Sequence, residues 1–233
     1  MFQQNNVVEK LREQIVKSAM KVGTDGVLLG CWVSCEKANT ILDIGCGTGL
    51  ITLMLGQRNL NSNVTGIEID KIASQEAQLN SSNSDWEERI EIKHTSLQQF
   101  TSQSKFDLIV SNPPFFPQNK SQQSRDIARH TNTLSFEELI DNAAKLLASK
   151  GIFSAIIPKN SEEYFCKIAN VHELYRNRVC YIKGNETSQV KRVMMEFSFI
   201  KSVVLTEHLT IESSRHNYTD KYIQLCKDFY LKM

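Results

Sequence analysis

Short apolar runs alternate with amphipathic stretches along the first two thirds of the chain. The apolar runs have the length of buried strands and cover residues 40–45, 63–69, 89–94, 105–111 and 151–158. Patterns typical of helices lie between them, at residues 49–58, 70–82 and 135–151. Strands that alternate with helices in this way are typical of a parallel sheet covered by helices on both faces. The sequence therefore predicts an α/β fold around five parallel strands.

The helical stretch at 135–151 carries a signal at each end. Ser135 and Glu138 match a capping box, in which each side chain bonds the backbone of the other residue. Gly151 is of the residue type that most often follows the last turn of a helix. We therefore expect this helix to begin after Ser135 and to end at Gly151.

After the fifth strand, two strands are predicted in direct succession. Residues 171–183 and 189–202 flank a Gly184-Asn185 turn and predict an antiparallel hairpin. Five parallel strands followed by an antiparallel pair are an unusual ending for a dinucleotide-binding sheet. They match the Rossmann-like class I methyltransferase sheet, which is mainly parallel and in which the last of the seven strands inserts antiparallel.

Composition limits the classes of protein. The chain of 233 residues is long enough for a sizeable core, and its hydrophobic content of 41% is ordinary for a soluble protein. No apolar run approaches the ~18 residues of a membrane span, and the N-terminus lacks the apolar segment of a secretory signal. The six cysteines show no CxxC pair and no histidine at zinc-ligand spacing. We expect a cytoplasmic protein with no metal and no membrane partner; a monomer is compatible with these data, which leave the oligomeric state open.

A glycine-rich loop follows the first predicted strand. The segment LDIGCGTGL, residues 42–50, places Gly45, Gly47 and Gly49 around Cys46. Glycines let the backbone turn tightly and approach a ligand closely, and the amide groups of a helix N-terminus point into the same crevice. Nicotinamide, flavin and sulfonium cofactors all use such a loop, so the glycines alone do not choose among them.

Two carboxylates favour S-adenosylmethionine among these cofactors. Asp43 precedes the glycines, where it can attract ordered water or the cationic methionine end of the cofactor. Glu68 ends the second strand roughly twenty residues after the glycines, where a carboxylate accepts both ribose hydroxyls. Ser96 follows the third strand, where many proteins of this fold have an Asp that binds the adenine amino group. Ser96 would accept that hydrogen bond more weakly.

The fourth strand ends in Asn112-Pro113-Pro114-Phe115, at the sheet edge where open α/β sheets bind ligands. An exocyclic amine of adenine is a poor nucleophile because its lone pair is delocalised into the ring. Two acceptors, the Asn112 side-chain carbonyl and the Pro113 backbone carbonyl, would stabilise its move toward tetrahedral geometry. Pro114 holds the preceding residue extended, and Phe115 offers a flat face for the base. These residues predict methyl transfer to an amino group without a general base.

The set of motifs resembles the amino-methyltransferases with an Asn-Pro-Pro-aromatic signature, a group that includes DNA adenine enzymes and release-factor glutamine methyltransferases. Within that group, further stretches are similar to the tRNA1(Val) adenine-37 N6-methyltransferase family. They are AMKVGTDGVLLGCW (19–32), RDIARHTNTLSF (125–136) and RHNYTDKYIQLCKDFYLKM (215–233). The likeness runs over essentially the whole chain.

This resemblance implies S-adenosylmethionine as donor, S-adenosylhomocysteine as product, and as acceptor the adenine just 3′ of the anticodon in a valine tRNA. It implies a catalytic turn formed by Asn112, Pro113, Pro114 and Phe115. The expected cofactor-binding residues are Lys21, Thr24, Asp25, Asp43, Gly45, Cys46, Gly47, Gly49, Glu68 and Ser96. We expect a single domain with an N-terminal helical segment over the cofactor (1–38), a cofactor-binding core with the catalytic turn (39–158), and a C-terminal hairpin and tail (159–233).

A basic segment next to the catalytic turn suits an RNA substrate. The net charge of +1 supplies no overall attraction for nucleic acid, so RNA binding requires a local patch. Residues 118–133 are polar, and the hairpin adds Lys183 and two further cations. The predicted RNA-binding residues are Lys120, Arg125, Arg129, Lys191 and Arg192. A base of the anticodon loop is already outside a duplex, so its presentation costs less than flipping a paired base.

Three other functions remain to be distinguished. A glutamine-amide protein methyltransferase would use the same turn, but about 40 residues before the first strand leave little room for a recognition domain. A DNA adenine methyltransferase usually has a separate target-recognition domain, which the sequence does not show. A non-catalytic RNA-binding protein on the same scaffold would be free to lose Asn112, which is present.

Overall fold

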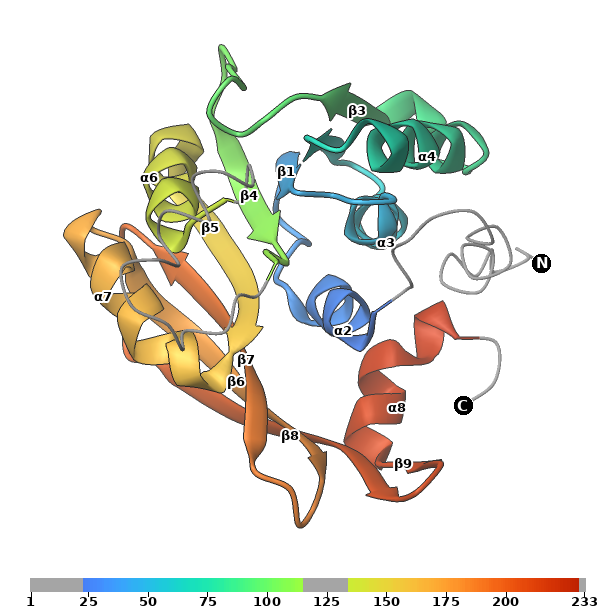
Figure 1. Ribbon diagram of the computed structural model, residues 1–233, viewed down its shortest axis with the longest axis vertical. Coiled ribbons are helices and arrows are strands. Elements are labelled where there is room, and N and C mark those ends of the chain that lie inside the picture. Colours follow the sequence, from blue (N-terminus) through green and yellow to red (C-terminus); the bar gives the residue numbers. More distant parts are fainter. Residues whose placement is uncertain (1–22, 115–133, 231–233) are drawn as a thin grey trace.

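The computed structural model describes residues 23–114 and 134–230, whose strands form one twisted sheet (Figure 1). The five predicted parallel strands are present: β1 (Thr40–Ile44), β2 (Asn63–Glu68), β3 (Ile90–His94), β4 (Phe106–Ser111) and β5 (Leu147–Pro158). Neighbouring strands pair in the order β3-β2-β1-β4-β5, all parallel. The predicted α/β fold with a mainly parallel sheet is confirmed.

The hairpin is also confirmed, and the sheet continues beyond it. The hairpin strands are β6 (Tyr175–Asn185) and β7 (Val190–Ser198), and β7 inserts antiparallel between β5 and β6. Two strands that the sequence did not predict follow: β8 (Leu205–Ser214), parallel to β6, and the short β9 (Asn217–Tyr218). The sheet therefore has nine strands among the described residues rather than seven.

Helices cover both faces of the sheet. One face carries α2 (Thr24–Trp32), α3 (Leu50–Arg58), α4 (Lys71–Ser82) and α8 (Asp220–Cys226), and the other carries α6 (Phe136–Leu146) and α7 (Glu162–Val171) (Figure 1). Single 3-10 turns lie at Glu87–Arg89, Lys159–Ser161 and Lys227–Phe229. Two buried clusters fill the space under these helices, one around Met54 and Ile156 and the other around Phe153 and Phe165.

The predicted capping box of α6 is present, but the predicted end of the helix is wrong. The Ser135 side chain accepts from the backbone N–H of Glu138, and the Glu138 carboxylate accepts from the backbone N–H of Ser135. The helix ends at Leu146, and Gly151 lies inside β5. A Cβ atom at Gly151 would lie 2.9 Å from the Phe106 carbonyl oxygen, so this glycine allows β5 to approach β4 closely.

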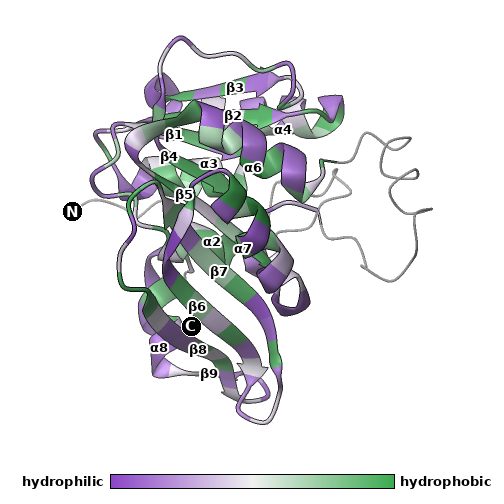
Figure 2. Cartoon of the chain, turned by 90° about the vertical axis from the view of Figure 1, so that its left-hand side faces the viewer, coloured by the Kyte–Doolittle hydropathy of each residue, from purple (hydrophilic) through white to green (hydrophobic). Residues whose placement is uncertain are grey.

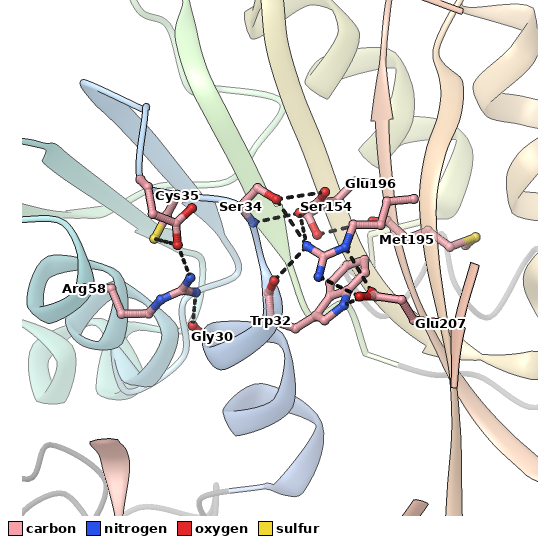
Figure 3. Close-up of polar contacts among 11 residues, drawn as sticks. Gly30, Trp32, Ser34, Cys35, Arg58, Ser154, Met195, Glu196 and Glu207 are labelled. Atoms are coloured by element: carbon pink, nitrogen blue, oxygen red, sulfur yellow. Dashed lines mark hydrogen bonds and ion pairs between the residues drawn. The ribbon is translucent and has the colours of Figure 1, made fainter. Parts of the chain in front are cut away.

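A polar cluster centred on Arg178 of β6 holds the C-terminal end of α2 against the sheet (Figure 3). The Arg178 guanidinium donates to Glu207 of β8 (Nε to Oε2, 3.0 Å) and to the Trp32 carbonyl (3.1 Å), and lies 4.1 Å from the centre of the Trp32 ring. The Trp32 indole donates to the same Glu207 oxygen at 2.7 Å. Glu196 of β7 accepts from the Ser34 backbone N–H at 2.7 Å. Strands β6, β7 and β8 thus fix the position of α2.

Candidate active site

Strands β1, β2 and β4 end side by side at one edge of the sheet. Ile44 of β1 is in register with Ile67 of β2 and with Ser111 of β4. The residues that follow these positions are Gly45, Glu68 and Asn112, and neighbouring strands of a sheet lie about 4.8 Å apart. The glycine loop, the acidic strand end and the Asn-Pro-Pro turn meet at this edge, as the sequence predicted.

The glycine loop adopts conformations that favour glycine. Gly45, Gly47 and Gly49 have φ values of 71°, 56° and 87°, in the left-handed region. The backbone N–H groups of Gly45 and Cys46 both donate to the Ile67 carbonyl, at 2.9 and 3.0 Å, which ties the loop to β2. A Cβ atom built at Gly45 would meet no other atom of the described residues within 4 Å, and Gly45 is exposed. The loop backbone is thus tied down on one side and accessible at Gly45.

Glu68 is held by the backbone on both sides of its carboxylate. Its Oε2 atom accepts from the Gly47 N–H at 2.9 Å, and its Oε1 atom accepts from the Asp70 N–H at 2.8 Å. The side chain is buried. Each carboxylate oxygen has a second lone pair, so the group can still accept hydrogen bonds from a ligand. The sequence placed Glu68 at this edge, and the structure adds that it also shapes the glycine loop.

Asp43 is fully buried beneath the loop. Its Oδ2 atom accepts from the Thr52 hydroxyl at 2.6 Å, whereas Oδ1 has no hydrogen-bond partner among the described residues. Burial raises the pKa of Asp43 to about 7, against the lowering effect of the Thr52 hydrogen bonds. A buried oxygen without a protein donor is suited to accept a hydrogen bond from water or from a ligand. Thr52 was missed by the sequence reasoning, because a threonine in the first turn or so of a helix carries no signal of its own.

The Asn112 side chain presents a second such oxygen. Its Oδ1 atom is buried and has no partner among the described residues. Pro113 is buried, and the hydroxyl of the preceding Ser111 donates to the Ile44 carbonyl at 2.9 Å, which fixes the end of β4 to β1. A Cβ atom at Gly26 of α2 would lie 3.8 Å from Asn112 Nδ2, so this helix packs close to the turn. Pro114 is exposed, and Phe115 lies outside the described residues.

The remaining predicted cofactor residues are spread around this edge. Thr24 is exposed and Asp25 half-buried, both in the first turn of α2, and Lys21 lies outside the described residues. Cys46 is buried, and burial raises the pKa of its thiol well above its usual value. The Ser96 hydroxyl accepts from the Gln99 N–H at 3.3 Å and is half-buried after β3.

Two of the predicted RNA-binding residues can be placed. Lys191 is exposed on β7 next to an irregularity in its pairing with β6, between Ile182 and Lys183. Arg192 donates from Nε to Asp25 Oδ2 at 2.7 Å. The structure therefore joins a residue expected to bind RNA with one expected to bind the cofactor. Lys120, Arg125 and Arg129 lie outside the described residues.

The described residues form neither a metal site nor a membrane-spanning helix. Residues 23–114 and 134–230 contain no group of three or more His, Cys, Asp or Glu side chains that could hold a metal ion. Within the same two ranges, no helix is long and apolar enough to cross a lipid bilayer.

Comparison with known proteins defines the class first. The family model "Methyltransferase small domain" matches residues 13–176, more than half of the chain. Among solved structures, a predicted O-methyltransferase from Agrobacterium tumefaciens superposes with a TM-score of 0.67 at 18% identity, over 88% of this chain and 96% of that one. A class I S-adenosylmethionine-dependent methyltransferase from Listeria monocytogenes gives a TM-score of 0.64 at 15% identity, over 98% and 80% of the two chains. The fold is that of the class I methyltransferases.

Curated relatives identify the family more closely. The tRNA1(Val) (adenine(37)-N6)-methyltransferase of Flavobacterium psychrophilum is 46% identical over 93% of this chain and 95% of its own length. The enzymes of the same name from Phocaeicola vulgatus and Pseudoalteromonas translucida are 44% and 42% identical over 93% and 92% of this chain, and over 93% of each relative. This chain belongs to the tRNA1(Val) (adenine(37)-N6)-methyltransferase family. It is an enzyme that uses S-adenosylmethionine.

The residues at the edge fit this cofactor. S-adenosylmethionine carries a cationic sulfonium, an amino acid end and a ribose. The buried Oδ1 atom of Asp43, which no described donor contacts, and the accessible backbone at Gly45 suit the first two groups. The Glu68 carboxylate, already oriented by two backbone N–H groups, suits the ribose hydroxyls.

Proposed function

We propose that this enzyme methylates the N6 amine of adenine-37 in the anticodon loop of a valine tRNA. The observation that carries the proposal is the buried Asn112 Oδ1 atom, which has no donor among the described residues and lies at the end of β4, one strand from the glycine loop. An exocyclic amine would supply the N–H donor that Asn112 Oδ1 lacks. The names of the relatives at 42–46% identity support the choice of tRNA as substrate.

The chemistry follows from the two acceptors of the turn. When bound, S-adenosylmethionine supplies a methyl group attached to a sulfonium sulfur. The neutral thioether that remains after transfer is a good leaving group. Asn112 Oδ1 and the Pro113 carbonyl would each accept one N–H of the adenine amine, which directs its lone pair at the methyl carbon. Transfer of this methyl group from sulfur to the amine nitrogen would leave S-adenosylhomocysteine as product, and the extra proton on nitrogen would pass to water, so no residue of the chain would be required as a general base. Phe115 would stack on the base, and Pro114 would keep the turn extended.

Different residues would bind different parts of the cofactor. Asp43 and the backbone of Gly45, Cys46, Gly47 and Gly49 would bind the methionine end, and Glu68 the ribose. Ser96 would accept from the adenine amino group only by releasing or sharing its bond to Gln99. Lys21, Thr24 and Asp25 would close the site from the N-terminal side.

Cations outside the catalytic turn would bind the tRNA substrate. Lys120, Arg125, Arg129 and Lys191 would contact tRNA phosphates around the loop. Arg192, expected from the sequence to join them, pairs with Asp25 instead. The enzyme would act in the cytoplasm, where tRNA is modified.

The proposal is tested by transferring labelled methyl groups to tRNA from a strain that lacks this enzyme. N6-methyladenosine should appear, by nucleoside mass spectrometry, at the position 3′ of a valine anticodon. Asn112→Ala should lower kcat by about 100-fold or more, as removal of a group that stabilises a transition state does, while leaving cofactor affinity within about twofold. Asn63→Ala is the matched control, because it removes the same type of side chain from an exposed position at the start of β2, far from the catalytic turn.

Other outcomes would change the conclusion in defined ways. Label on a release-factor glutamine or on duplex DNA, with none on tRNA, would keep the reaction and replace the substrate. Normal turnover by Asn112→Ala would remove this side chain from the catalytic step. Cofactor binding without transfer to any acceptor would indicate a non-catalytic RNA-binding protein.

A further inference from the structure

Strands β6, β7 and β8 extend past the edge that carries the active site. Pro158, the last residue of β5, is in register with Arg192 of β7, which is in register with Ile182 of β6. Residues 183–185 of β6 and 210–214 of β8 therefore lie beyond the end of β5. We refer to residues 181–193 and 208–214 as the arm. Figure 1 shows the arm extending past the arrowheads of β4 and β5.

The two faces of the arm differ. On one face α8 packs against β8, where Leu209 is buried with Tyr222 and Cys226. The other face carries α7 only as far as the end of β5, and no helix of the described residues covers the arm beyond it (Figure 2). Tyr181 and His208 are in register on β6 and β8 at the border of this uncovered face, with ring centres 5.5 Å apart.

The uncovered face combines flat rings with positive charge. Lys159, just after β5, places its Nζ 5.6 Å from the centre of the Tyr181 ring. Lys183 and Lys191 form no ion pair with any described residue. His208 and Lys191 are exposed, and Lys183 is half-buried.

The negative charge at the border of this face is compensated, whereas Glu186 and Glu212 near its tip form no ion pair with a described residue. Glu162, at its border, accepts from Lys159 Nζ at 2.7 Å, from the Tyr181 hydroxyl at 2.8 Å, and from Arg176. Glu212 lies nearer the tip, opposite Asn185. Unpaired lysines around an aromatic pair form the combination that binds the backbone and bases of single-stranded nucleic acid.

Strand spacing places this face at a useful distance from the catalytic turn. Asn112 follows β4, and β6 and β8 are three and four strands away, or about 14 and 19 Å. Successive nucleotides lie about 3.4 Å apart along a stacked strand, so an RNA whose adenine lies against Asn112 would reach the arm within roughly six nucleotides.

We propose that the uncovered face of the arm is a docking surface for the tRNA backbone outside the target base, with Lys183 and Lys191 on phosphates and the Tyr181–His208 pair against a base or ribose. This inference rests on the proposed function, because it assumes that RNA enters the catalytic turn. It differs from the expectation from sequence by including β8 and by leaving out Arg192, which bonds Asp25.

The test uses Lys183→Gln/Lys191→Gln, with the full chain and intact tRNA. The matched control is Lys37→Gln/Lys150→Gln, since both lysines are exposed and lie at the opposite edge of the sheet, before β1 and near the start of β5. The arm variant should raise the KM for tRNA about tenfold with kcat and cofactor affinity unchanged. It should also reduce the slope of log K against log salt by about 2, one for each lost phosphate contact. His208→Ala should weaken tRNA binding at least about fivefold by loss of stacking.

Direct binding of tRNA, followed by fluorescence anisotropy, separates this inference from the proposed function. Arm variants that bind and methylate tRNA with the same affinity and salt slope as the control would overturn the docking surface while the activity stands. If the wild-type enzyme methylates no tRNA, the proposed function fails, and the affinities still decide whether RNA uses the arm. Wild-type enzyme that binds no tRNA would overturn both.

Discussion

Arg192 and Asp25 form an ion pair of 2.7 Å, although 167 positions separate them in the sequence. The pair joins β7 to the first turn of α2, next to the catalytic turn. Both side chains are partly buried, at 33% and 23% exposure, so the interaction is less screened than one on the surface. We conclude that Arg192 positions α2, whichever ligand lies beside it.

The role of this pair can be measured with a double-mutant cycle. Arg192→Gln and Asp25→Asn should each raise the KM for S-adenosylmethionine several-fold, because either change releases the N-terminal end of α2. The double variant should be no worse than either single one, with a coupling energy of about 1 kcal/mol. Additive effects, or an Arg192→Gln effect confined to the KM for tRNA, would show that Arg192 acts directly on RNA.

Glu68 has two functions that substitutions can separate. Glu68→Ala removes both the proposed ribose acceptor and the anchors for the Gly47 and Asp70 N–H groups. Hydrogen bonds to a charged group contribute about 1.5–3 kcal/mol, so cofactor affinity should fall by roughly 10- to 100-fold in a calorimetric titration. Glu68→Gln keeps one acceptor oxygen, so its affinity for the cofactor should lie between those of the wild type and of Glu68→Ala. Unchanged affinity in Glu68→Ala would exclude it from the cofactor site.

The stability of the cofactor-free protein should depend on the protonation of Asp43. Burial raises the pKa of Asp43 from 3.8 to about 7, so between these values the folded chain holds a proton that the unfolded chain has lost. The free energy of unfolding therefore falls as pH rises through this window, and the stabilising contribution is lost above about pH 7. Urea unfolding at about pH 5 and about pH 8 should show a smaller difference for Asp43→Asn than for the wild type.

A Thr52→Val variant tests whether Asp43 causes this pH dependence of stability. The Thr52 hydroxyl donates to Asp43 and lowers its pKa, so its loss should move the fall in stability to higher pH. If the free energy of unfolding of Asp43→Asn depends on pH as strongly as that of the wild type, a titratable group other than Asp43 causes the dependence.

Arg178 should contribute to stability through its contacts with Glu207, Trp32, Ser34 and Glu196. Arg178→Met removes the bonds to Glu207 and Trp32 and leaves the Glu207 carboxylate without its cation. We expect a loss of about 2 kcal/mol in the free energy of unfolding, less than for a fully buried pair because the Arg178 side chain is partly exposed. Cofactor affinity should also fall, since α2 loses its attachment. The exposed Arg215, replaced by Met, is the control and should change stability by less than about 0.5 kcal/mol.

Much of the fold was predictable because its signals are local. Each parallel strand is a run of apolar residues between turn residues, and the glycine loop and the Asn-Pro-Pro turn directly follow strands, so parallel pairing alone brings them to one edge. The end of α6 was not predictable in this way. Gly151 had the signature of a helix end, but its lack of a side chain serves contact with Phe106, on a strand some 40 residues earlier in the chain.

The strand β8 was missed for a different reason. Its residues are mostly polar or exposed, and of its one covered face only Leu209 is buried. Such a strand at the margin of a sheet lacks the apolar alternation that identifies an inner strand. The Asp25–Arg192 and Asp43–Thr52 contacts depend on how helices pack against the sheet, so no local pattern announces them. Roles assigned to Lys21, Phe115, Lys120, Arg125 and Arg129 stay predictions.

The packing of α8 has a consequence for synthesis on the ribosome. Tyr222, Cys226 and Phe229 share one buried cluster with Val27 and Leu28 of α2, the first helix of the described chain. Because α2 also lies against Asn112, the helix beside the catalytic turn has its full packing only after residues near 229 have left the exit tunnel. The nascent chain can therefore form most of its parallel sheet early, yet it acquires a complete active site only after the last described helix has emerged from the ribosome.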